Sequence, residues 1–72
     1  MIKIYTVKLA NEHSFRYELI KFCEQHKISV YITYMQEDIF TDVIFCDLVI
    51  PEAAEERFKV KYSKAIIHHA IV

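Results

Sequence analysis

The 72-residue sequence contains no glycine, and this absence excludes several kinds of functional site. Loops that hold phosphate or a dinucleotide, and strained turns that present a nucleophilic serine, need glycine for positive φ angles or close approach of the backbone. The sequence is therefore not expected to contain any of these motifs. A chain of this length forms one domain, residues 1–72, whose core lies near the minimum for independent folding.

Long apolar runs and an excess of one charge are absent as well. The longest strongly apolar stretch covers residues 43–50, whereas a membrane-spanning helix needs roughly 20 apolar residues. Nine lysines and arginines oppose ten acidic residues, so no basic field favours nonspecific contact with nucleic-acid phosphates. The first residues are typical of a strand and not of a signal peptide. We therefore expect a cytoplasmic protein without membrane contact.

Cysteine is scarce, and its two occurrences are not spaced like a metal motif. Cys23 and His26, together with Cys46 and either His68 or His69, could supply zinc-type ligand atoms. Their spacing matches no compact zinc module, and Cys23, His26 and Cys46 fall at positions expected in the core. We therefore expect no metal and no cofactor. In a reducing compartment both cysteines are expected to be buried, free thiols.

The patterns that are present predict strands and helices in alternation. Residues 2–8 alternate in the manner of a strand. Residues 12–26 are predicted to form a helix, with Asn11 as the N-cap and Glu12 in the first turn. The apolar stripe of this helix comprises Phe15, Leu19, Phe22, Cys23 and His26.

Three further strands are predicted after this helix. Residues 28–34 are rich in β-branched and aromatic side chains, and residues 35–38 are expected to form the turn that follows them. Residues 43–50 are predicted to form a strand that ends at Pro51, because proline cannot donate to a strand ladder. The apolar, β-branched residues 65–72 are predicted to form the last strand.

Residues 52–62 fit two patterns. A proline followed by acidic residues is typical of a helix start, and Ala54, Phe58 and Tyr62 would share one face of that helix. However, Phe58, Val60 and Tyr62 also alternate with lysines, which is a strand pattern. We favour the helix, in which Phe58 and Tyr62 pack inward while the lysines stay in water. A strand here would form a hairpin with the preceding strand and change the fold.

The resulting order, β-α-β-β-α-β, predicts the ferredoxin-like split fold of the α+β class. In this fold a four-stranded antiparallel sheet carries both helices on one face, and the other face is left open. The first and third strands are central neighbours in such a sheet. Because many unrelated activities occur on this fold, it does not by itself indicate a function.

Side-chain alternation predicts which residues lie on the open face. Taking Lys3 and Asp47 to point outward places Tyr5, Val7 and Phe45 on that face. The side chains expected to form a contact surface are Tyr5, Tyr31, Val43 and Phe45. Apolar patches of this kind on small proteins usually mark contact surfaces. Replacing Tyr5 or Phe45 with alanine is therefore expected to weaken association and to leave the monomer folded.

The same architecture occurs in RNA-recognition modules, which stack bases on aromatic side chains of the first and third strands. Residues 4–9 resemble the first signature of that family, with Tyr5 at its aromatic position. Residues 41–48 match the second signature at Phe45, but Val43 replaces the other aromatic residue, and the basic residue and the glycine are absent. The resemblance implies an alternative function, an aromatic platform for single-stranded nucleic acid.

No arrangement of nucleophile, base and acid is predicted, so we expect no enzymatic activity. Ser14 follows His13 at a helix start, where capping is the simpler role. His68 and His69 point to opposite faces of a strand and cannot act together on one substrate. The predicted function is a protein–protein interaction or regulatory module. It is expected to associate with itself or another protein, through the open sheet face or a strand edge.

Overall fold

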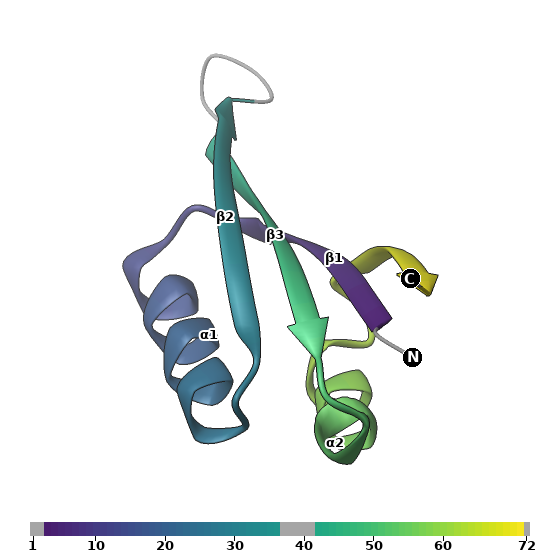
Figure 1. The fold of residues 1–72 in the computed structure, drawn as a ribbon. Coiled ribbons are helices and arrows are strands. Elements are labelled where there is room, and N and C mark those ends of the chain that lie inside the picture. Colours follow the sequence, from purple (N-terminus) through teal and green to yellow (C-terminus); the bar gives the residue numbers. More distant parts are fainter. Residues whose placement is uncertain (1–2, 37–41, 72) are drawn as a thin grey trace.

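A computed structural model describes residues 3–36 and 42–71 of the chain (Figure 1). The elements are β1 (Lys3–Ala10), α1 (His13–Gln25), β2 (Ser29–Gln36), β3 (Asp42–Ile50), α2 (Glu52–Tyr62) and β4 (Ile66–Ile71). This order confirms the predicted sequence of strands and helices. The turn predicted at residues 35–38 is wrong for Met35 and Gln36, which belong to β2; residues 37 and 38 lie outside the described residues.

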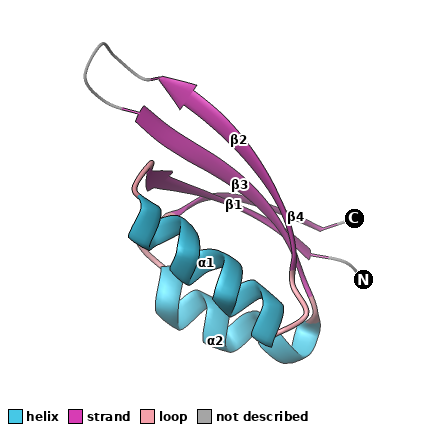
Figure 2. Cartoon of the chain, turned by 90° about the vertical axis from the view of Figure 1, so that its left-hand side faces the viewer, coloured by secondary structure: helices cyan, strands magenta, loops and turns pink. Residues whose placement is uncertain are grey.

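The strands form one antiparallel sheet in the order β2-β3-β1-β4. Both helices lie against the same face of this sheet, and within the described residues no helix or strand covers the other face (Figure 2). The predicted ferredoxin-like α+β fold is therefore confirmed. The register also confirms that β1 and β3 are the central strands, whereas β2 and β4 form the two edges.

The core lies between the sheet and the helix layer. The buried residues of α1 are Leu19, Phe22 and Cys23. Those of α2 are Ala54, Phe58 and Tyr62. These spacings place each set on one face of its helix. The largest fully buried side chains are Phe58, Leu19, Ile44, Leu48, Val7, Cys23 and Cys46. They come from both helices and from the two central strands, so the core ties all of these elements together.

The start of α1 differs from the prediction. Glu12, not Asn11, occupies the N-cap position, and no side-chain hydrogen bond caps this end among the described residues. The Asn11 side-chain oxygen instead accepts a hydrogen bond from the Arg16 guanidinium. Arg16 lies about one turn into the helix, so this contact joins the first turn of α1 to the residue that precedes its N-cap.

The end of α1 shows how a chain without glycine terminates a helix. Lys27 takes the left-handed conformation, with φ of 57°, just after the C-cap residue His26. The N–H of Ile28 then donates to the carbonyl of Cys23 at 2.9 Å, which is the long hydrogen bond of a Schellman motif. This position usually carries glycine, because a side chain there costs roughly 1–2 kcal/mol.

Residues 52–62 form a helix and not a strand, which confirms the favoured prediction. Phe58 and Tyr62 are buried together with ring centroids 5.5 Å apart, while Lys59 and Lys61 remain exposed. Pro51 takes the N-cap position with an extended backbone, and acidic residues occupy the first turn. The strand alternative for this segment is therefore excluded.

The predicted facing of β1 is wrong. Tyr5 and Val7 point into the helix-side core, where Tyr5 is 4% exposed and its ring lies 5.2 Å from that of Phe58. The reason is Lys3, whose charge predicts a position facing solvent. Its ammonium group instead reaches Glu55 on α2, so Lys3 shares the helix face with Tyr5 and Val7. A lysine at a strand end can lie on the buried side because its long stem brings the charge to a partner.

Candidate interaction surface

The open face of the sheet is more polar than the sequence suggested. Thr6 lies opposite both Asp47 and His68, and its hydroxyl donates to the Asp47 carboxylate at 2.7 Å. On the next row of this face, the Lys8 ammonium group lies 6.0 Å from the centre of the Phe45 ring. A polar row therefore crosses the centre of the face and separates its apolar side chains.

The structure separates the four residues that were predicted to form the contact surface. Tyr5 belongs to the core. Val43 is also buried, although it lies on the same open side of β3 as Phe45. Tyr31 and Phe45 do share the open face on neighbouring strands, where Tyr31 is exposed and Phe45 is half-buried. Tyr5→Ala is consequently expected to destabilise the fold and not to act on association alone, since Tyr5 is part of the core.

The position of Tyr5 also argues against the base-stacking platform implied by the resemblance to RNA-recognition modules. The aromatic position of the first signature falls on the helix face, so Tyr5 cannot stack on a base bound to the open face. Phe45 remains on the open face but lies opposite Lys8, not opposite a second aromatic ring. The two-aromatic platform that the resemblance implied is not formed by these residues.

β2 is an edge strand with an unusual composition. Its residues, Ser29–Gln36, include no charged side chain and no proline, and no described strand pairs with its outer side. Edge strands of soluble proteins are normally protected by charges, proline, bulges or short length. The opposite edge, β4, is shorter and has a register shift opposite Thr6 and Val7. Of the two edges, β2 is the one that lacks protection.

Exposed apolar side chains stand on both faces of β2. Tyr31 and Met35 both lie on the open face, and Tyr31 is 67% exposed. Tyr34 lies opposite Ile44 on the helix face, yet it is 62% exposed. Figures 1 and 2 show the reason, because the far ends of β2 and β3 extend beyond the helix layer. The edge therefore presents apolar side chains around unpaired backbone groups.

The flank of α1 continues this exposed apolar edge. Phe15, Glu18 and Phe22 line hollows that α1 shares with α2. Ile20 lies roughly a third to half a turn around the helix from Glu18 and Phe22, so it belongs to the flank away from α2. Figure 1 shows α1 beside β2, which places this flank on the side of the β2 edge. Ile20 is 39% exposed there, and Tyr17 is also exposed.

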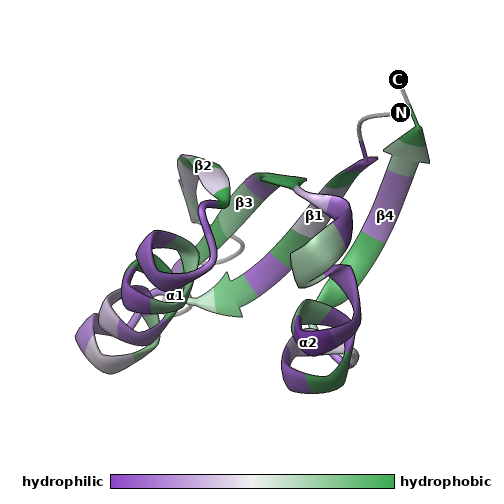
Figure 3. Cartoon of the chain, turned by 60° about the horizontal axis from the view of Figure 1, so that its bottom comes forward, coloured by the Kyte–Doolittle hydropathy of each residue, from purple (hydrophilic) through white to green (hydrophobic). Residues whose placement is uncertain are grey.

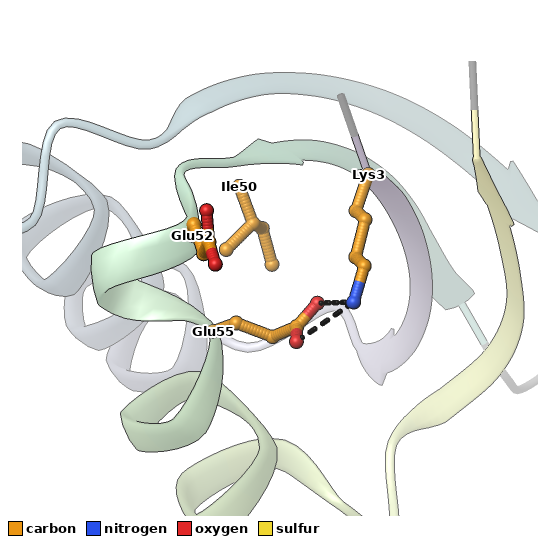
Figure 4. A pocket seen from close by; sticks show the side chains of 4 residues that line it. All are labelled: Lys3, Ile50, Glu52 and Glu55. Atoms are coloured by element: carbon orange, nitrogen blue, oxygen red, sulfur yellow. Dashed lines mark hydrogen bonds and ion pairs between the residues drawn. The ribbon is translucent and has the colours of Figure 1, made fainter. Parts of the chain in front are cut away.

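A small pocket of about 180 Å³ lies at the junction of β1 and α2 (Figure 4). Glu55 is its central group: both carboxylate oxygens lie within 2.9 Å of the Lys3 ammonium nitrogen. The Tyr5 hydroxyl donates to the same carboxylate at 3.2 Å. The hydrogen bond from Lys3 lowers the pKa of Glu55, and the same bond raises the pKa of Lys3. These contacts join α2 to β1.

Replacing Glu55 with glutamine is expected to lower the free energy of unfolding at neutral pH. Because the pKa of Glu55 is lowered in the folded state, its contribution is complete above the ordinary carboxyl pKa and is lost as pH falls through the lowered value. Glu55→Gln should therefore flatten the acid side of the stability profile, measured by urea unfolding between neutral and acidic pH. Glu52→Gln, at an exposed residue of the same pocket, is the control. Identical acid profiles for Glu55→Gln and the unmodified protein would contradict this role.

The cysteines and histidines do not converge. Cys23 and Cys46 are buried and free, as predicted. His26 packs on Phe22 with ring centroids 4.4 Å apart, and the exposed His68 and His69 lie on opposite sheet faces, where His69 stacks on Tyr5. In residues 3–36 and 42–71, no group of three or more histidine, cysteine or acidic residues is placed to hold a metal ion.

Two further findings concern membrane insertion and similarity to known proteins. Neither α1 nor α2, the helices in the described ranges, is long and apolar enough to cross a membrane. Comparison of the chain with models of protein families, with curated proteins and with solved structures found no match. Any functional conclusion therefore depends on the surface just described.

Proposed function

We propose that this protein is a non-enzymatic interaction module that pairs with a second copy of itself along β2. The observation that carries the proposal is the unprotected edge, a strand without charge or proline whose outer side has no partner in the described residues. Pairing of two such edges satisfies the exposed backbone groups of both strands. It also gives a domain of this length additional apolar burial, which small cores need.

The exposed side chains favour one register. Two copies related by a twofold axis perpendicular to the sheet pair antiparallel, and opposite residues then lie on the same face. An axis through Thr33 places Tyr31 opposite the partner's Met35, and Ile32 opposite the partner's Tyr34. Aromatic rings pack well against methionine sulfur and against β-branched side chains. This register therefore covers the three most exposed apolar side chains of the strand.

The same axis brings the two copies of α1 together beneath the joined sheets. Ile20 lies on the flank of α1 that faces the axis, so it becomes covered when the edges pair. Nearby Arg16 and Glu24, one half-buried and one exposed, supply charges of opposite sign on this flank. One contact thus covers the exposed apolar side chains of β2 and Ile20 of α1.

Thr33→Lys tests the proposal, because the axis would hold the two introduced lysines directly opposite each other. Like charges in that position destabilise a strand pair, and lysine is the residue that commonly protects natural edges. Sedimentation equilibrium should show a dimer for the unmodified protein, and a dissociation constant raised by at least roughly 10-fold for Thr33→Lys. Ile67→Lys, at an exposed residue of the opposite edge, should leave the dimer intact.

Two results would refute the proposal. One is an unmodified protein that stays monomeric at high concentration; the other is a Thr33→Lys variant that dimerises as well as Ile67→Lys. The same experiment with added single-stranded RNA addresses the alternative function. A monomer that binds RNA with a steep salt dependence would favour nucleic-acid binding on the open face, where Tyr31, Phe45 and Lys8 lie.

A further inference from the structure

A groove runs between α1 and α2 on the outer side of the helix layer. It consists of two adjoining hollows of about 380 and 470 Å³ that share Val60 and Lys61. Phe15 and Phe22 of α1 line it from one side, and Figure 3 shows the two helices that border it. We call this surface the interhelix groove.

Val60 is the feature of the groove that the fold does not explain. Its side chain is 80% exposed and lies at the outer rim, on the side of α2 away from the core residue Phe58. Phe15, in the groove, is also 40% exposed. A polar residue at position 60 would be compatible with the fold, because Val60 is exposed and is not part of the core. The groove therefore offers two apolar contacts that nothing in the described chain covers.

The charges around the groove are mainly positive. Lys21, Arg57, Lys61 and Lys64 border it or the adjoining hollow of α1, against the carboxylates of Glu18 and Glu56. Within the described residues Arg57, Lys61 and Lys64 form no ion pair, and Lys61 lies 5.0 Å from the centre of the Phe22 ring. This positive region belongs to a chain whose net charge is −1.

We propose that the interhelix groove binds an acidic, amphipathic segment of a partner protein. An apolar side chain of that segment would pack between Val60 and Phe15, as amphipathic helices do in apolar grooves. Its carboxylates would pair with Arg57, Lys61 and Lys64, which form no ion pair with any other described residue. Recognition of this kind combines an apolar anchor with complementary charge, which sets the specificity and the rate of association.

The groove is separate from the proposed dimer contact. Its lining residues on α1, Phe15 and Phe22, are on the flank that faces α2, whereas Ile20 is on the flank that faces β2. Binding at the groove is therefore expected with or without dimer formation. The Thr33→Lys variant should bind the acidic segment as the unmodified protein does, which makes the two proposals separable.

The test uses a fluorescein-labelled synthetic helical peptide, rich in glutamate and with two leucines one turn apart. Fluorescence anisotropy should show salt-dependent binding, and a matched peptide with lysine in place of glutamate should not bind. Val60→Asp and Lys61→Glu should each weaken binding by at least roughly 10-fold. Lys27→Glu makes the same charge change as Lys61→Glu but lies outside the groove, so it should have little effect.

Three outcomes would overturn the proposal. The glutamate peptide could fail to bind, or Lys27→Glu could weaken binding as much as Lys61→Glu, which would indicate nonspecific attraction. The third is an anionic phospholipid vesicle that binds with the same sensitivity to Val60→Asp while the peptide does not. That result would assign the groove to a membrane surface. Circular dichroism of each variant confirms that a loss of binding does not reflect unfolding.

Discussion

Phe58→Ala is expected to lower the free energy of unfolding by about 3–5 kcal/mol, the usual cost of removing a buried aromatic side chain. Phe58 is fully buried, and its ring lies 5.2 Å from that of Tyr5 and 5.5 Å from that of Tyr62. It therefore joins α2 to the central strand β1. Small domains have total stabilities of roughly 5–15 kcal/mol, and a chain of this length lies at the low end. A substantial unfolded population is expected for the variant.

Val60→Ala is the matched control, because Val60 lies on the same helix two residues away and is 80% exposed. Its stability change should stay within roughly 0.5 kcal/mol. Urea unfolding followed by circular dichroism measures both variants. Equal losses for Phe58→Ala and Val60→Ala would show that α2 faces the sheet differently, and the assignment of its buried face would then be wrong.

The helices could be predicted because their buried residues repeat at helical spacing. Phe58 and Tyr62, one turn apart, identified the inner face of α2 although the strand pattern competed. Tyr5 could not be placed as reliably, since a strand has only two faces and one misassigned residue reverses all of them. The rest of β1 favours the observed facing, because Thr6 and Lys8 are polar and lie on the face opposite Tyr5, whereas Lys3 alone indicates the reverse.

The exposed edge was predictable only in general terms. The sequence shows that residues 29–36 carry no charge, and the predicted fold, with the first and third strands in the centre, places this strand at an edge. A central strand without charge is ordinary, whereas an edge strand without charge is exceptional. The exposure of Tyr34 does not follow from the sequence, because it depends on how far the helix layer extends beneath the sheet.

The two thiols are expected to react with alkylating reagents at least roughly 100-fold more slowly in the folded protein than in the unfolded chain. Burial raises the pKa of Cys23 and of Cys46 from 9.0 to about 11, and the thiolate is the reactive form. A rise of two pKa units reduces the thiolate population roughly 100-fold at neutral pH, before access is considered. Labelling by iodoacetamide with and without urea, followed by mass spectrometry, measures the ratio. Rapid native labelling of either thiol would refute its burial.

The raised pKa values of the two thiols also predict that the free energy of unfolding falls at high pH. Below pH 9 the thiols are protonated in both states, so pH has little effect through them. Between pH 9 and about 11 the unfolded chain ionises first, so the free energy of unfolding falls as pH rises. Burial likewise raises the pKa of Tyr62 to about 12, and its hydroxyl has no hydrogen-bond partner in the described residues. Cys23→Ala combined with Cys46→Ala should reduce this alkaline slope in urea unfolding and leave the part that comes from Tyr62 and Lys3, whose pKa values are also raised. An unchanged slope would show that the thiols ionise alike in both states.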